Sequence, residues 1–269
     1  MGIEIVHSSP ESNELSLPFI SRNLQADGGV VHGGIIGSLL HDCGLALAAE
    51  AVGAPDFETL RCLDFQANYL KAAKDCDLTA SAQIIRQSRK FIFIQAEVLD
   101  PKNHIVATSR MLFALTGEAA ATKAIQPYLT AEKIGVGIPN SHPMVDMMNT
   151  SMVERRPGFS IDGAEGGICR ILVDDLAVNQ NYKGEISNGA QIFAADSAAV
   201  FSCFASGEPM MRAATVDLKL TFCAPVVGEG LTVLGESLVL NDGLVHHQLS
   251  IFGKSSKDLK AFGTMTLAI

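Results

Sequence analysis

The sequence lacks the patterns by which several classes of protein are recognised. It has no block of lysine and arginine residues, and its net charge of −9 argues against a nucleic-acid-binding surface. Its six cysteines form no C-x-x-C pair and several lie within apolar runs, so we expect reduced core thiols in a cytoplasmic protein. The N-terminal segment has no basic stretch followed by an apolar one, so no signal peptide is predicted.

Metal and membrane signals are also missing from the sequence. His246 and His247 are adjacent on a predicted strand, so their side chains point to opposite faces and cannot jointly hold a metal ion. No other group has metal-ligand spacing, and we expect neither a metal nor a cofactor. The longest apolar stretch, near residues 35–49, is short for a membrane span and is interrupted by polar residues, so no membrane partner is expected.

Apolar residues are abundant instead. They make up 48% of the chain while only 18% of residues are charged, which predicts a soluble globular protein with a sizeable core. The run that follows Gly29 is the most informative segment. His32, Gly33 and Gly34 open a stretch of small and apolar residues without a breaker until Gly53, which predicts a buried helix with an accessible N-terminus.

The same order of elements is predicted twice, and this repeat decides the fold class. In the first half the apolar helix is followed by strand-forming segments at 60–73, 78–88, 91–99 and 104–115. In the second half a strand-forming segment at 167–182 precedes an apolar helix at 188–206, and strands are predicted at 212–222, 231–240, 244–252 and 259–269. We therefore expect an α+β protein made of two similar repeats.

The repeats define the expected domain organisation. Residues 1–115 form the first repeat and residues 166–269 the second. The segment 116–165 between them contains several prolines and is predicted to be an irregular linker that covers the repeats.

The motif HGGIIGSLLHD at residues 32–42 and the strand LDFQANYLKAA at residues 63–73 resemble those of acyl-CoA thioesterases of the phenylacetate-pathway type. The whole chain is similar to a tandem, or double, hotdog, in which two curved antiparallel sheets each wrap around a central apolar helix. The resemblance implies a thioester hydrolase with an acyl-CoA substrate. In that family, each site takes a His-Gly-Gly turn from one hotdog and a carboxylate from the other.

The two halves keep different parts of this site. In the first half His32, Gly33 and Gly34 match the turn, but His41 stands at the carboxylate position, nine residues after His32. Asp42 is one residue beyond the carboxylate position, which rotates its side chain about 100° around the helix.

The second half has lost the turn and kept the acid. The turn has become Ser187-Asn188-Gly189, and Asp196 stands nine residues after Ser187, at the carboxylate position. Asn181 and Thr215 match positions where some relatives carry an asparagine near the thioester and a hydroxyl that helps to hold the water. A rival alignment, which shifts the turn by one residue, places Asn188 against His32.

The resemblance therefore implies one complete site per chain, between the two repeats. The residues that it assigns to catalysis are Asp196, Gly34, Thr215 and His32. Those that it assigns to substrate binding are Gly33, Asn181, Asn188, Gly189, His41 and Asp42, of which the last four belong to a second site that we expect to be compromised.

The chemistry requires these parts. Thioester hydrolysis passes through a tetrahedral oxyanion, and backbone N–H groups at the Gly33–Gly34 helix end can stabilise it; losing one such donor costs roughly 3 kcal/mol. Asp196 would activate water as a general base, or attack the thioester directly, and the sequence leaves both mechanisms open.

Each site residue also has a structural interpretation. A His-Gly-Gly string commonly marks an ordinary turn, and Asp196 could be an acid that reaches solvent from the helix surface. Thr215 could be an ordinary strand residue, Asn181 could form a turn or a helix cap, and His41 could be a core residue.

Two other functions are compatible with the sequence. Asp27 and His32 stand five residues apart, as the acid and histidine do in enoyl-CoA hydratases of the hotdog type, but Gly29 and Val30 replace the asparagine–proline pair of that family. A non-catalytic acyl-CoA-binding module is the second alternative.

The substrate contacts and the assembly are only loosely constrained by the sequence. No obvious basic cluster is available for the phosphates of coenzyme A. The candidates are Lys71, Lys74, Arg86, Arg89 and Lys90. A homodimer or a higher oligomer of double hotdogs is compatible with the sequence.

Overall fold

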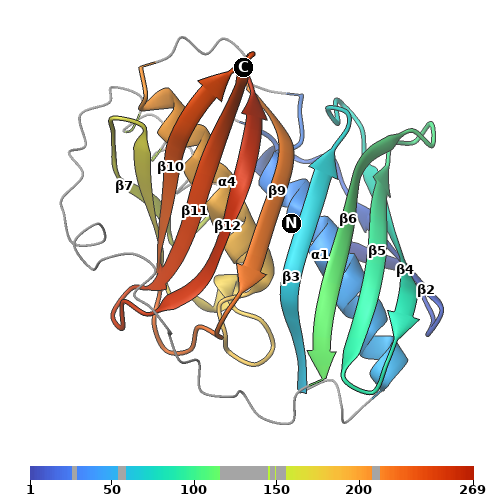
Figure 1. Ribbon diagram of the computed structural model, residues 1–269. Coiled ribbons are helices and arrows are strands. Elements are labelled where there is room, and N and C mark those ends of the chain that lie inside the picture. The colour runs from blue at the N-terminus through green and yellow to red at the C-terminus, as the bar shows by residue number, and fades with distance from the viewer. Residues whose placement is uncertain (26–28, 54–58, 116–144, 146–148, 150–155, 208–212) are drawn as a thin grey trace. The chain divides into compact units, whose positions relative to one another are not determined.

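Two antiparallel sheets, each with one long helix against one face, make up most of the described part of the chain (Figure 1). The structure is a computed structural model that describes residues 1–25, 29–53, 59–115, 145, 149, 156–207 and 213–269. The chain divides into two units, Met1–Ala120 and Ala121–Ile269.

The first unit contains helix α1 (Gly33–Val52) and six described strands. The strands are β1 (Glu4–Ser8), β2 (Ser12–Leu17), β3 (Leu60–Tyr69), β4 (Leu78–Gln87), β5 (Phe91–Leu99) and β6 (Ile105–Leu115). Their order in the sheet is β1-β2-β4-β5-β6-β3, and every pair within the unit is antiparallel. A short 3-10 turn, η1 (Ser21–Asn23), precedes α1.

The second unit repeats this connectivity. It contains helix α4 (Asn188–Phe204), the 3-10 turn η3 (Ala177–Asn179) and six described strands. The strands are β7 (Phe159–Glu165), β8 (Ile168–Val173), β9 (Ala214–Phe222), β10 (Leu231–Asn241), β11 (Leu244–Gly253) and β12 (Leu259–Ala268). The sheet order β7-β8-β10-β11-β12-β9 is that of the first unit, element for element, so the predicted duplication and the double hotdog are confirmed.

Strand β7 corrects the predicted linker. Residues 159–165 fall within the segment 116–165 that the sequence suggested as irregular, yet they form a strand that pairs with β8. Phe159 and Ile161 bury their side chains, and Gly166 and Gly167, both with positive φ, turn the chain into β8. The strand is short and lies beside a proline and several glycines. Because these residues are typical of loops, the composition of the segment did not indicate a strand. Most of residues 116–155 lie outside the described residues.

The core of each unit lies between its helix and its sheet. Helix α1 is long and apolar enough to cross a membrane by length and composition alone, but it packs against its own sheet, with Leu39, Leu40 and Leu47 fully buried. Helix α4 lies close to β10. A Cβ atom on Gly235 would collide with the backbone carbonyl of Ala198, so glycine is required where the helix approaches this strand.

Candidate active site

His32 caps the N-terminus of α1. Its Nδ1 accepts a hydrogen bond from the Gly34 N–H at 3.0 Å, and its carbonyl accepts from the N–H groups of Ile35 and Ile36. The Gly33 N–H has no hydrogen-bond partner among the described residues. The turn therefore offers one open backbone donor at Gly33, whereas the Gly34 donor is held by the imidazole.

Ser187 caps α4 in the same way. Its Oγ accepts from the Ala190 N–H at 3.1 Å, and its carbonyl accepts from the Gln191 N–H. Asn188 begins the helix, and its Oδ1 accepts from the Gln191 side-chain amide at 3.3 Å.

The chain approaches both caps by equivalent hydrogen bonds. The His32 N–H donates to the Asn23 carbonyl at 3.0 Å, and the Ser187 N–H donates to the Asn179 carbonyl at 2.9 Å. Both asparagines are buried at the end of a 3-10 turn. These matching contacts favour the alignment of Ser187, and not Asn188, with His32.

Asp196 lies in the middle of α4 and is 1% exposed. Thr215, in β9, donates a hydrogen bond from its Oγ1 to Asp196 Oδ1 at 2.9 Å. A buried carboxylate is unfavourable unless hydrogen bonds compensate for its lost hydration, and the threonine hydroxyl is one such donor. The structure thus brings together two residues that the sequence singled out, and it excludes the interpretation of Asp196 as an acid exposed on the helix surface.

The equivalent place in the first unit has no such pair. His41 is 2% exposed, its Nδ1 lies 3.2 Å from Asp42 Oδ1, and its ring packs near those of Phe65 and Phe113, with centroids 6.3 and 6.2 Å away. The Asp42 side chain is 37% exposed. Cys62 stands where the second unit has Thr215, and burial raises the pKa of its thiol far above the usual value. His41 is therefore built into the core of its unit.

Asn181 is engaged within its own loop. Its Oδ1 accepts from the N–H groups of Lys183 and Glu185, and its Nδ2 donates to Glu185 Oε2 at 3.0 Å. The asparagine closes a turn ahead of α4, so its side chain has a structural use whatever its part in substrate binding.

One group of polar residues was missed by the sequence reading. Asp100, Lys102 and His104, which lie between β5 and β6, gather with Lys71 at one end of the first sheet. In the part of the chain that the structure describes, no cluster of three histidine, cysteine or acidic side chains could hold a metal ion. Asp27, named in the hydratase alternative, lies outside the described residues.

Comparisons with known proteins bear on this geometry. Residues 28–107 match the family model of the thioesterase superfamily. A Bacillus subtilis (strain 168) protein named as an esterase, ComA2, is 29% identical over 117 residues, which cover 43% of this chain and 90% of that protein. The residues of this chain that match the family model include the whole of the His32 turn.

Solved structures match the entire chain. The tesB protein of Mycobacterium avium subs paratuberculosis superposes with a TM-score of 0.69 at 11% identity, covering 98% of this chain and 95% of that one. The acyl-CoA thioesterase II TesB2 of Mycobacterium marinum gives 0.64 at 12% identity, with 98% and 95% covered. A hot dog protein of Alicyclobacillus acidocaldarius gives 0.65 at 13% identity, with the same coverage. The fold identifies the chain as a double hotdog protein, and residues 28–107 of its first repeat match the thioesterase superfamily.

Proposed function

We propose that this protein hydrolyses acyl-CoA thioesters at a single composite site, which combines the His32 turn of the first unit with the Asp196 carboxylate of the second. The observation that carries the proposal is the hydrogen bond of 2.9 Å between Thr215 and a carboxylate that is almost wholly buried. The thioesterase match of residues 28–107 and the name of the Mycobacterium marinum neighbour, an acyl-CoA thioesterase, supply the substrate class.

Asp196 has the chemistry of a general base. Its carboxylate takes a proton from a water molecule while the water oxygen bonds to the thioester carbonyl carbon. The C–S bond then breaks, and the coenzyme A thiolate leaves and takes up the proton that Asp196 accepted, which restores the carboxylate. The Thr215 hydroxyl donates a hydrogen bond to Asp196, so the lone pairs on its oxygen are free to accept a hydrogen bond from that water. Direct attack by Asp196 to form an acyl anhydride uses the same residues.

The oxyanion is assigned to the N-terminus of α1. The open N–H of Gly33 is one donor, and the positive end of the helix dipole favours the developing charge. Gly34 supplies a second donor once the His32 imidazole rotates away from its N–H. His32 therefore acts on the reaction through Gly34, as the residue that holds and releases this donor.

We propose that the second, pseudo-equivalent site is inactive. It would combine the turn Ser187-Asn188-Gly189 with His41 and Asp42, and His41 is a core residue packed beside aromatic rings. No carboxylate stands at its catalytic position. Because all six cysteines are free, we also propose a reducing, cytoplasmic location.

Hydrolysis of a panel of acyl-CoA thioesters, followed by release of the thiol, tests the proposal. We expect turnover by the wild type, a loss of about 10²- to 10⁴-fold in kcat for Asp196→Asn, and little change for Asp42→Asn. A loss confined to Asp42→Asn would mean that the wrong acid has been assigned. Hydration of an enoyl-CoA without hydrolysis, or tight binding without turnover, would support one of the two alternative functions instead.

A further inference from the structure

A surface pocket of about 340 Å³ lies within the first unit, at one end of its sheet. The loop after β3 and the turn between β5 and β6 line it, and it contains three lysines, a histidine and a half-buried cysteine. These residues are Lys71, Lys74, Lys102, His104 and Cys76.

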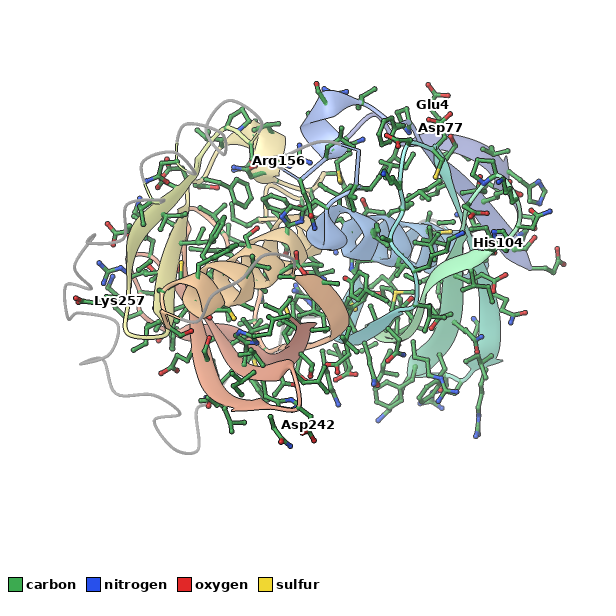
Figure 2. All side chains as sticks on the ribbon, turned by 90° about the horizontal axis from the view of Figure 1, so that it is seen from above. Glu4, Asp77, His104, Arg156, Asp242 and Lys257 are labelled. Atoms are coloured by element: carbon green, nitrogen blue, oxygen red, sulfur yellow. The ribbon has the colours of Figure 1, made fainter. Side chains whose placement is uncertain are left out.

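Asp100 organises one wall of the pocket. Its carboxylate accepts hydrogen bonds from Lys71 Nζ at 2.6 Å and from the backbone N–H groups of Lys102 and His104 at 2.9 and 3.0 Å. His104, which follows the turn between β5 and β6 (Figure 2), places its Nδ1 3.0 Å from the same carboxylate. These hydrogen bonds, of which that from the Lys71 ammonium has the largest effect, hold the pKa of Asp100 well below its usual range. Asp100 therefore stays ionised and fixes the turn, while its charge is balanced by Lys71.

Two further cations remain open to a ligand. Lys74 and Lys102 are exposed, and neither ammonium group has an ion-pair or hydrogen-bond partner among the described residues. The second acid of the pocket, Asp75, is exposed, so the three lysine ammonium groups of the pocket outnumber its two carboxylates. Two unpaired ammonium groups beside a fixed hydrogen-bonded wall suit an anion with several oxygens, such as a phosphate.

Backbone hydrogen bonds join this pocket to the His32 turn. Lys74 forms an antiparallel bridge with Val30, and the Val31 N–H donates to the Ala73 carbonyl at 2.9 Å. Gly33 is the third residue after Val30, so the Cα atoms of Lys74 and Gly33 are at most about 16 Å apart. The flexible pantetheine arm of coenzyme A joins the thioester to the phosphates, so one substrate can place a carbonyl at the helix end and its phosphates at the lysines.

We propose that this pocket binds the phosphate groups of the coenzyme A thioester, with Lys74 and Lys102 as the contacting cations. The inference rests on the proposed function. It also selects among the candidate cations, because Arg86, Arg89 and Lys90 lie near the turn between β4 and β5, at the opposite end of the same sheet.

Paired substrates test the proposal kinetically. Acyl-CoA and the corresponding acyl-pantetheine share the thioester but differ in the phosphates. We expect Lys74→Ala and Lys102→Ala to raise KM for acyl-CoA by about five- to tenfold each, with kcat and the KM for acyl-pantetheine unchanged. Lys74→Arg and Lys102→Arg should restore most of the binding, and Lys90→Ala is the matched control.

The outcomes separate the two proposals. Unchanged KM values in the alanine variants of a working hydrolase overturn the pocket and leave the thioesterase proposal intact. An increase in Lys90→Ala alone would place the phosphates at the other end of the sheet and would also overturn it. Failure of the wild type to hydrolyse any thioester refutes the thioesterase proposal and leaves the pocket to a binding measurement.

The alkylation rate of Cys76 can be used to measure binding in the absence of turnover. Its thiol lines the pocket and is half-buried, as is that of Cys223 in the second unit, whereas the other four cysteines are buried. Adenosine 3′,5′-bisphosphate should slow alkylation of Cys76 and leave Cys223 unaffected, and Lys74→Ala with Lys102→Ala should remove this protection. Equal alkylation with and without the bisphosphate would refute phosphate binding at this pocket.

Discussion

Thr215 Oγ1 lies 2.9 Å from Asp196 Oδ1 and joins the start of strand β9 to the buried side of helix α4. This contact leads to the first prediction. Thr215→Val keeps the shape of the side chain but removes the donor, and the loss of a hydrogen bond to a charged group should lower kcat about 10- to 100-fold. Thr215→Ser should restore most of the activity with little change in KM. Equal activity of the valine and serine variants would show that the hydroxyl only packs in the strand.

Asp196 itself should lower the stability of the protein. A buried carboxylate loses hydration that its hydrogen bonds replace only in part, so Asp196→Asn should raise the free energy of unfolding by about 1 kcal/mol while lowering kcat about 10²- to 10⁴-fold. Urea unfolding followed by circular dichroism measures the first effect. A large loss of stability would instead identify Asp196 as a structural residue of α4.

The two helix caps form a matched pair. Removing the cap in His32→Ala or Ser187→Ala should cost about 1 kcal/mol of stability in each case, because each side chain satisfies one N–H of its helix. Only His32→Ala should also change kcat/KM, since only that cap adjoins the proposed oxyanion donors. Thermal denaturation and steady-state kinetics on both variants check this. Identical kinetics for the two variants would contradict the assignment of the active turn to α1.

His247 should make the protein sensitive to acid. It is 1% exposed, its Nδ1 lies 3.3 Å from the Met265 carbonyl, and burial lowers its pKa from the usual 6.5 to about 4. The unfolded chain therefore binds the proton more tightly than the folded one. The contribution of the neutral imidazole is fully present above pH 6.5 and is lost as the pH falls towards 4, by at most about 3 kcal/mol.

Substitution separates this effect from those of other groups. The free energy of unfolding of His247→Gln should fall less between pH 6.5 and pH 4 than that of the wild type. His7→Gln, at an exposed position, should follow the wild type. Parallel curves for all three proteins would exclude His247 as the origin of the acid sensitivity.

Two glycines should differ in their tolerance of alanine. The Cβ of Gly235→Ala would meet the Ala198 backbone carbonyl, which cannot move without shifting α4, so a loss of about 2 to 3 kcal/mol is expected. The Cβ of Gly44→Ala would meet the end of the flexible Met111 side chain, which can rotate, and alanine also favours the helix. Chemical denaturation should show Gly44→Ala close to the wild type.

The sequence was sufficient for the two helices and for the four strands that follow each of them, whereas β1 and β2 were not predicted. Helices α1 and α4 are apolar on nearly every face, and a helix of that kind is stable only when other structure encloses it. The sequence also singled out the acid at position 196 and the hydroxyl at 215, because their spacing follows a family pattern. Strand β7 escaped detection, since it is short and its turn is formed by Gly166 and Gly167.

Other features depend on contacts that no linear pattern contains. Asp100 and Lys71 are far apart in the sequence, and they meet because the antiparallel meander returns β6 beside β3. The cap formed by His32 on Gly34 also became visible only in the folded chain. The sequence suggested a free N–H at Gly34, whereas the structure has it bound to the imidazole.

Joining the two hotdogs in one polypeptide has an evolutionary consequence. In a symmetric dimer each mutation occurs in both subunits, so a change that damages one site damages its twin. Here each unit has its own helix and sheet, and position 41 is histidine whereas position 196 is aspartate. In a single chain the two copies can change independently, so under the proposed function one half supplies the acid and the other the anion-binding turn, and neither change is imposed on its counterpart.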